Sequence, residues 1–201
     1  GYELMLAKLA EDRRRLKDIQ STEKKIDAKR ELLPQYAAYI EGALTGNGAQ
    51  DDVLTSVMVW LIDIEDYQKA FDVAAYALKH GMTLPDQYQR PMACLIAEEV
   101  ADTQLTYQAA GKPMNLPALQ HAMCLTAEHD MPDQVRSKLH KAIGYALRDD
   151  EHPDNQAAIE HLRRAFELFD KVGVKKDIER LETVIKNSPA PQEGDTPQDE
   201  T

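Results

Sequence analysis

The sequence is poor in the residues and patterns that define several classes of protein. Only two cysteines occur in 201 residues, which excludes a disulfide framework. Aromatic residues make up 6% of the chain, and no β-branched or aromatic run bounded by turns predicts a strand. No apolar stretch approaches the roughly 20 residues needed to span a bilayer, and we expect no secretory signal. We expect Cys94 and Cys124 to be buried, reduced thiols in a cytoplasmic protein.

What the sequence does contain favours helices, because Ala, Leu, Glu, Lys, Gln and Asp dominate it. We predict an all-α fold in which a long, coiled-coil-like helix over 1–33 precedes a core of packed helical hairpins over 34–187. Residues 188–201 combine proline with acidic residues and have no apolar pattern, so we expect a disordered tail. Within the core, the predicted segments are 35–45, a hairpin over 51–80, 91–110, 117–128, 132–148 and a second hairpin over 154–187.

The hairpin at 51–80 has the clearest local signals. Gly46, Asn47 and Gly48 tolerate positive φ and predict a turn. Asp51 can accept hydrogen bonds from the free N–H groups at the start of a helix, and Asp66 can do the same for a second helix. No 34-residue period relates this hairpin to the one at 154–187, so we do not predict a tetratricopeptide array.

Residues 2–33 contain neither glycine nor proline, which predicts one long helix ending before Pro34. Apolar residues recur at heptad a and d positions, although Asp12, Glu23 and Arg30 interrupt the seam. One interpretation is an amphipathic helix packed on its own subunit, and the other is a helix that packs between subunits. The second interpretation makes four residues candidates for oligomerisation: Leu9, Leu16, Ile19 and Ile26.

The formal net charge of −11 is unevenly distributed. Residues 1–33 hold nine Lys/Arg against seven Asp/Glu, whereas residues 34–201 hold 15 against 28. DNA binding by such an acidic chain requires a local basic surface, and otherwise the basic run is a solvated helix face. The first predicted helix carries that run, which gives six candidate DNA contacts: Arg13, Arg14, Arg15, Lys17, Lys24 and Lys25.

No motif predicts catalysis, a metal site or a cofactor. The loop GNGAQDD at 46–52 lacks the lysine and hydroxyl of a P-loop. Five neighbouring acids invite comparison with a two-metal nuclease, but their places at predicted helix ends favour capping. The six histidines form no HxxxH or HExxH pattern, so we expect isolated surface or helix-end residues. The five acids are Asp51, Asp52, Asp63, Glu65 and Asp66.

Four segments resemble the small terminase subunit of tailed phages, a family whose members are also described as terminase endonuclease subunits. The longest is GNGAQDDVLTSVMVWLIDIEDYQKAFDVAAYALKHGMTLP at 46–85. Shorter matches are KRELLP at 29–34 and DMPDQVRSKLHKAIGYALRD at 130–149, followed by HLRRAFELFDKVGVKKDIERLE at 161–182. These segments match the family in order and spacing and extend over most of the predicted helical region.

The resemblance implies a role in phage DNA packaging in the host cytoplasm. It implies recognition of the packaging site on concatemeric double-stranded DNA, a ring-forming homo-oligomer, and regulation of the large terminase subunit. The resemblance implies that the large subunit carries the ATPase motor and, in general, the nuclease, so we expect no cofactor here. The residues themselves predict no metal site and no membrane partner. Two alternatives stay open: a Mg²⁺-dependent endonuclease subunit that cuts the cohesive-end site, and a helical adaptor that binds only protein.

Overall fold

The computed structural model describes residues 1–188, and all of its regular elements are helical, as predicted. The predicted disordered tail lies outside this range except for Ser188. No helix within residues 1–188 is long and apolar enough to cross a membrane. The elements are α1 (Tyr2–Asp18), α2 (Thr22–Leu32), the 3₁₀ turn η1 (Leu33–Tyr36), α3 (Ala37–Leu44), α4 (Asp52–Asp63), α5 (Tyr67–Lys79), α6 (Met92–Ala109), α7 (Leu116–Thr126), α8 (Asp133–Arg148), α9 (Asn155–Leu168), the 3₁₀ turn η2 (Asp170–Val172) and α10 (Lys175–Asn187).

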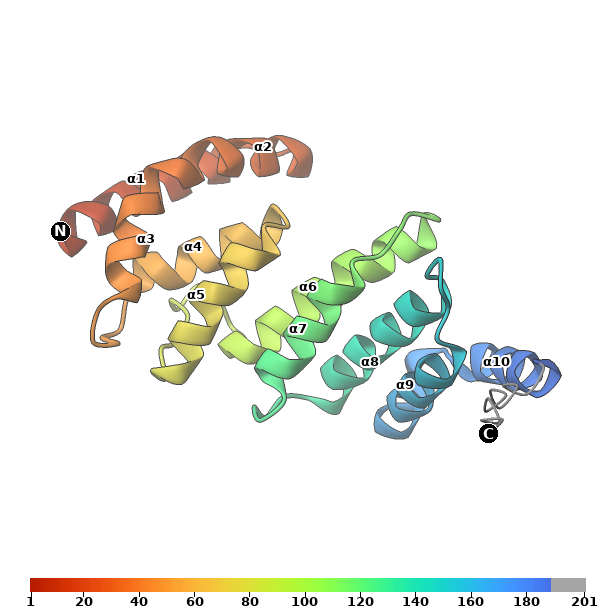
Figure 1. Ribbon diagram of the computed structural model, residues 1–201. Coiled ribbons are helices and arrows are strands. Elements are labelled where there is room, and N and C mark those ends of the chain that lie inside the picture. Colours follow the sequence, from red (N-terminus) through yellow and green to blue (C-terminus); the bar gives the residue numbers. More distant parts are fainter. Residues whose placement is uncertain (189–201) are drawn as a thin grey trace, which may run out of the picture.

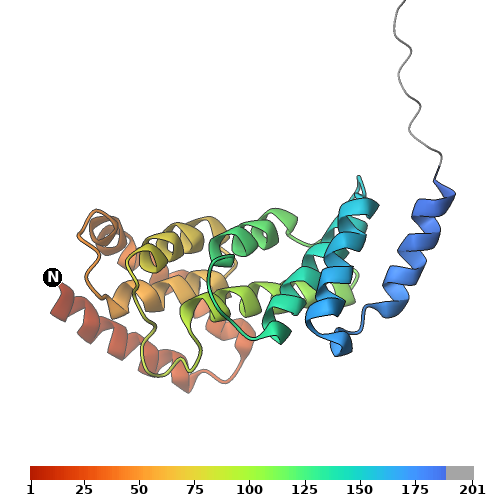
Figure 2. The same cartoon turned by 90° about the horizontal axis from the view of Figure 1, so that it is seen from below.

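The helices follow one another through space roughly in chain order (Figure 1). The start of α1 and α3 lie at one end of an elongated molecule, α2 reaches toward its middle, and α10 lies at the other end (Figure 2). Between these ends, the pairs α4–α5, α6–α7 and α8–α9 pack against each other, and α6 also contacts α4 and α8. The predicted hairpin core is therefore present as a row of helix pairs.

α4 is the most completely buried helix of the first half. Ten of its twelve residues, from Val53 to Ile62, are buried. A helix that is apolar around its whole circumference must be covered on every side. Four neighbours provide that cover, namely α1, η1, α5 and α6.

The polar residues predicted to start the 51–80 hairpin do cap its helices. Asp51 accepts a hydrogen bond from the Leu54 N–H at 2.8 Å, and Asp66 accepts one from Lys69 N–H. Later in the chain, Asn115 and Asp154 cap α7 and α9 in the same way. These side chains satisfy N–H groups that have no partner within the helix, so they fix where each helix begins.

The prediction of one continuous helix over 2–33 is wrong. The chain leaves helical geometry at Ile19, which is extended with φ −84° and ψ 123°. Ser21 then starts α2 by accepting a hydrogen bond from the Lys24 N–H at 3.3 Å. Serine at this position competes with helix continuation because its hydroxyl replaces an intrahelical partner. The break lets the chain turn so that α1 packs on α4 and α2 packs on η1.

The expectation of two buried cysteines is correct for one of them. Cys94 on α6 is buried, whereas Cys124 on α7 is exposed. α7 is covered along a stripe that includes Ala118, Leu119 and Ala122. Cys124 lies about 200° around the helix from Ala122, at 100° for each residue, so it points away from that stripe.

α8 and α9 form the most extensive helix pair, and they meet at a glycine. A Cβ atom added to Gly144 would lie 2.6 Å from Leu162 Cδ2 and 3.1 Å from the Ala158 carbonyl oxygen. The backbone carbonyl cannot move away without disturbing α9. Gly144 is therefore required for the close approach of the two helices.

We expect Gly144→Ala to lower the free energy of unfolding by about 1–3 kcal/mol, the usual cost of overpacking a core. The sign of this change in unfolding free energy is informative, because alanine is intrinsically a better helix former than glycine by about 1 kcal/mol and would otherwise stabilise the helix. Gly42→Ala on α3 is the matched control, since nothing lies within 4 Å of its added Cβ, and it should stabilise slightly. Urea unfolding followed by circular dichroism measures both, and a stabilising Gly144→Ala would contradict tight α8–α9 packing.

Candidate nucleic-acid interface

The three consecutive arginines of α1 have three different environments. Arg13 is half-buried, and its guanidinium donates to Ser56 Oγ on α4. With its amide oriented by hydrogen bonding, Gln87 accepts from Arg13 Nη2 and Nε at 2.9 and 3.1 Å. Arg15 faces Glu31 at 3.5 Å across the α1–α2 corner, where both side chains are exposed. Arg13 is therefore part of the α1–α4 contact and does not offer its charge to a ligand.

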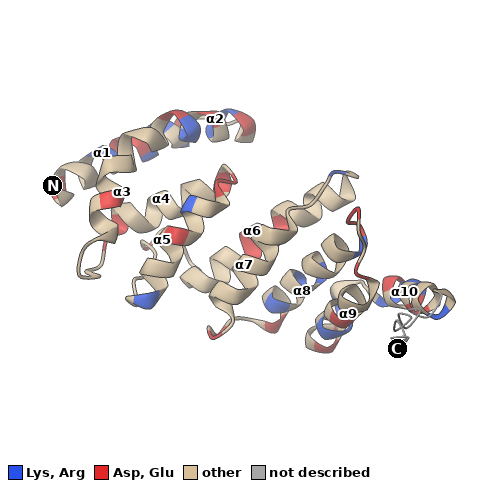
Figure 3. Ribbon diagram, in the orientation of Figure 1, with Lys and Arg blue, Asp and Glu red and all other residues tan. Residues whose placement is uncertain are grey.

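Of the six predicted DNA contacts, Arg15 alone forms an ion pair within residues 1–188, and four besides Arg13 remain without a described partner for their charge. Arg14 and Lys17 are exposed and lie one turn apart on α1. Lys24 is exposed and Lys25 is half-buried in the first turn of α2. Figure 3 shows basic residues on both helices, interspersed with acidic ones on α2. We call these four side chains together the basic surface of α1 and α2.

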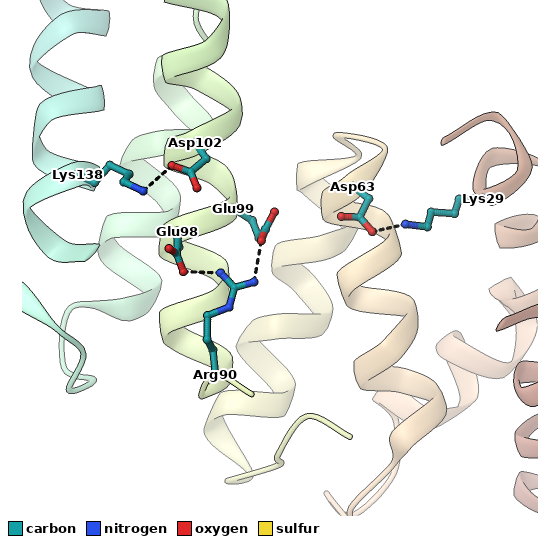
Figure 4. A network of polar contacts seen from close by, with 7 residues as sticks. All are labelled: Lys29, Asp63, Arg90, Glu98, Glu99, Asp102 and Lys138. Carbon is teal, nitrogen blue, oxygen red and sulfur yellow. Dashed lines mark hydrogen bonds and ion pairs between the residues drawn. The ribbon is translucent and has the colours of Figure 1, made fainter. Parts of the chain in front are cut away.

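Polar contacts hold the opposite side of these helices against the rest of the chain. The buried Asp12 carboxylate accepts hydrogen bonds from the Tyr36 hydroxyl at 2.6 Å and from Lys8 Nζ at 2.7 Å. Burial and this carboxylate raise the pKa of Tyr36 above its usual range. Lys29 on α2 pairs with Asp63 on α4 at 2.6 Å (Figure 4). The buried carboxylate is satisfied by these partners, so α1 is fixed on its inner face.

The residues predicted for oligomerisation divide between the core and the surface. Leu9 and Leu16 are buried on α1, in the core of the chain itself. Ile19, at the break after α1, and Ile26 on α2 are half-buried. Leu9 and Leu16 therefore pack within their own subunit, as the first interpretation predicts. Only Ile19 and Ile26 keep part of their side chains accessible to another subunit.

Several acidic residues of α4, α6 and the turn after α4 are engaged with basic and hydroxyl groups. On α6, Glu98 and Glu99 share Arg90, and Asp102 pairs with Lys138 of α8 at 2.8 Å (Figure 4). Capping was also predicted for Asp63 and Glu65, and it is wrong for both. Asp63 forms the ion pair with Lys29, and Glu65 accepts a hydrogen bond from Tyr107 from a left-handed backbone position with φ 63°. Within residues 1–188, no group of three or more His, Cys, Asp or Glu side chains could hold a metal ion.

Two histidines that are 21 residues apart meet across α8 and α9, so the expectation of isolated histidines is wrong for this pair. His140 Nδ1 and His161 Nδ1 are 2.9 Å apart, which requires one proton between them. Burial, the second imidazole, Arg164 and Arg136 lower the pKa of His140 to about 4. Burial also lowers the pKa of His161, while Glu160 opposes that shift. Both rings are therefore neutral at pH 7.

Because the folded state holds this pair neutral, we expect stability to be complete above about pH 6.5, the ordinary pKa of histidine. It should fall as the pH drops from there toward 4, since the unfolded chain binds protons that the folded chain excludes. The measurement is urea unfolding at pH 7.5 and 4.5 for the wild type and His140→Gln. The free energy of unfolding of the wild type minus that of His140→Gln should differ by about 1–2 kcal/mol between the two pH values, a figure discounted for partial solvent screening.

The exposed His152 provides the control for this titration. His152→Gln should show the same change in the free energy of unfolding between pH 7.5 and 4.5 as the wild type, because the side chain at position 152 is exposed in the folded protein. Equal pH dependence in the wild type and His140→Gln would contradict a neutral, shared-proton pair.

Comparison with known proteins assigns the chain to a family. The family model for the phage small terminase subunit matches residues 6–134. A terminase, endonuclease subunit from Escherichia phage P2 is 47% identical over 192 residues, covering 95% of this chain and 77% of the relative. A probable terminase, endonuclease subunit from Haemophilus phage HP1 (strain HP1c1) is 25% identical, covering 89% of this chain and 68% of that relative. No solved structure matches the chain.

The chain therefore belongs to the phage small terminase subunit family, as the resemblance of its four segments indicates. Such a protein takes part in the packaging of phage DNA. The match to the P2 relative extends over nearly the whole chain, including the basic surface of α1 and α2 and the α8–α9 pair.

Proposed function

We propose that this chain recognises the packaging site on concatemeric phage DNA, assembles with copies of itself and regulates the large terminase subunit in the host cytoplasm. The observation that carries the DNA-binding part is the basic surface of α1 and α2, whose four cationic side chains have no ion-pair partner in residues 1–188. Family membership supports the packaging context.

The electrostatics require several copies of this surface. The chain as a whole carries a net charge of −11 and repels DNA at long range. Phosphate contacts gain affinity by releasing counterions, and their contributions add with the number of contacts. A homo-oligomer, such as a ring, repeats Arg14, Lys17, Lys24 and Lys25 in each subunit, so weak contacts from one copy become strong together.

We expect Arg14→Gln combined with Lys17→Gln to weaken DNA binding and to lower the slope of log K against log salt by about 2 for each subunit that contacts the duplex. Fluorescence anisotropy with cognate duplex DNA over a salt series measures both quantities. Lys79→Gln combined with Lys112→Gln removes two exposed lysines from other helices and loops, so it controls for net charge. An equal loss in the control variant would mean that the contacts lie elsewhere.

Arg13→Gln separates structure from DNA binding within the same arginine run. Because Arg13 bonds to Ser56 and Gln87, this variant should lower stability while leaving the salt slope of the folded protein unchanged. A lower slope without a loss of stability would place Arg13 on the DNA. Salt-independent behaviour of the wild type would favour an adaptor that binds only protein.

A second candidate function is a Mg²⁺-dependent endonuclease that cuts the cohesive-end site. Both relatives are described as terminase endonuclease subunits, which favours it. The engagement of Asp51, Asp63 and Asp66 in caps and an ion pair disfavours it, because metal ligands need free carboxylate oxygens.

We expect the purified chain to leave cognate phage DNA intact in the presence of Mg²⁺, and to support cutting only when the large subunit is added. Gel electrophoresis of end-labelled DNA detects the products. Cleavage by the pure chain that disappears in Asp51→Asn or Asp63→Asn, with folding retained, would establish the endonuclease alternative.

A further inference from the structure

Within residues 1–188, the largest group of exposed cations without an ion-pair partner lies at the last helix. Five lysines and arginines of η2 and α10 are exposed and take part in no ion pair among the described residues. Figure 3 shows basic residues along α10, with acidic ones between them. The group exceeds the four cations of the basic surface of α1 and α2. Its members are Lys171, Lys175, Lys176, Arg180 and Lys186.

Two of the three acids of α10 already have partners on other helices. Asp177 pairs with Arg148 of α8 at 3.0 Å. Glu182 pairs with Arg163 of α9 at 2.9 Å. Glu179 is exposed and forms no ion pair within residues 1–188. α10 therefore presents four cations to solvent against one carboxylate that is not already paired.

The four cations of α10 lie along both edges of its outward face. Leu181 is the buried residue of α10, so it marks the side that packs on α9. At 100° for each residue, Lys175 and Lys186 lie about 120–140° around the helix from Leu181. Lys176 and Arg180 lie about 220–260° around it, on the other edge. The outward face is therefore bounded by positive charge on its two sides.

Two hydrogen-bonding side chains occupy the middle of that face. Glu179 and Thr183 lie one turn apart, at about 160° and 200° from Leu181, and both are exposed. The Thr183 hydroxyl donates to the Glu179 carbonyl oxygen at 3.1 Å, which leaves its own oxygen able to accept. A carboxylate between cations weakens a surface that binds only phosphate or an acidic protein. It suits a ligand that offers hydrogen-bond donors between two rows of negative charge.

The major groove of double-stranded DNA is such a ligand. It is about 12 Å wide, admits an α-helix and presents base edges between two phosphate backbones. α10 has 13 residues and is about 20 Å long, and it packs on α9 at one end of the molecule with its outward face exposed (Figure 2). Four acids among residues 189–201 follow α10 in the sequence and oppose the attraction to DNA. The contact therefore depends on repetition in an oligomer, as that of α1 and α2 does.

We propose that α10 binds in the major groove of the packaging DNA. The cations on each edge contact one phosphate backbone, while Glu179 and Thr183 contact base edges. A carboxylate accepts from the cytosine amino group, and the threonine methyl group packs on the thymine methyl group. This inference rests on the DNA recognition in the proposed function. It assigns the reading of sequence to α10, and it leaves to the basic surface of α1 and α2 the contacts that any sequence provides.

Lys176→Gln combined with Arg180→Gln tests the phosphate contacts. We expect binding to weaken by a similar factor for a duplex that carries the packaging site and for a scrambled duplex. The slope of log K against log salt should fall by about 2 for each subunit that places α10 on the duplex. Fluorescence anisotropy over a salt series measures both quantities. Lys79→Gln combined with Lys112→Gln should keep the wild-type slope, and a wild-type slope in the α10 variant would overturn the contact.

Glu179→Gln combined with Thr183→Ala tests the base contacts. The ratio of affinities for the packaging-site duplex and the scrambled duplex should fall about tenfold, while the salt slope stays unchanged. Glu128→Gln combined with Thr106→Ala is the matched control, because both residues are exposed and the Thr106 hydroxyl makes the same local bond to a helix carbonyl. The control should keep the wild-type ratio. An unchanged ratio in the α10 variant would exclude base reading by this helix.

The same measurements separate this inference from the proposed function. A lower salt slope for Arg14→Gln with Lys17→Gln, beside a wild-type slope for Lys176→Gln with Arg180→Gln, would overturn the α10 contact and leave the proposed function standing. A wild type that binds no duplex DNA even at low salt would overturn both. An α10 variant that keeps its DNA binding but no longer co-purifies with the large subunit would show that this face binds protein, which also overturns the inference.

Discussion

The burial of α4 is the constraint on which the first half of the structure depends. Its ten consecutive buried residues must be excluded from water on every side, and burial of each large apolar side chain stabilises by about 1.5–3 kcal/mol. α5 covers one side as the hairpin partner, and α6, η1 and α1 complete the enclosure. The break between α1 and α2 follows from this requirement, because a straight helix over 2–33 would carry its second half away from the body.

The same constraint divides the basic run. A helix that lies on α4 presents consecutive residues to different surroundings, so Arg13 turns inward to Ser56 while Arg14 faces solvent. The side chains that attach α1 to the body are therefore different from those available to a ligand. On α1 and α2, each subunit offers only the four cationic side chains of the basic surface to DNA. DNA binding by this surface therefore depends on assembly, which repeats these side chains.

The sequence predicts those parts of the fold that depend on local chemistry. Asp51 and Asp66 mark helix starts because a short side chain must satisfy free N–H groups, and that requirement is visible within three residues. It does not predict contacts between distant segments. The heptad pattern of α1 describes an apolar stripe, but whether Leu9 and Leu16 face the same chain or another depends on what covers α4. Likewise, nothing local indicates that His140 meets His161, because their contact is set by the approach of α8 and α9 at Gly144. Ser21 was the one local signal of the α1–α2 break, and the absence of glycine and proline obscured it.

The order of the helix pairs along the row has a consequence for how the protein is made. Because neighbours in space are mostly neighbours in sequence, each pair can bury its apolar face soon after it leaves the ribosome. Contacts of short sequence separation also favour fast folding. α4 is the exception, since it stays partly uncovered until α6 has been synthesised. The interval between residues 63 and 109 is therefore the stage of translation at which the nascent chain exposes the helix that the folded protein buries most completely.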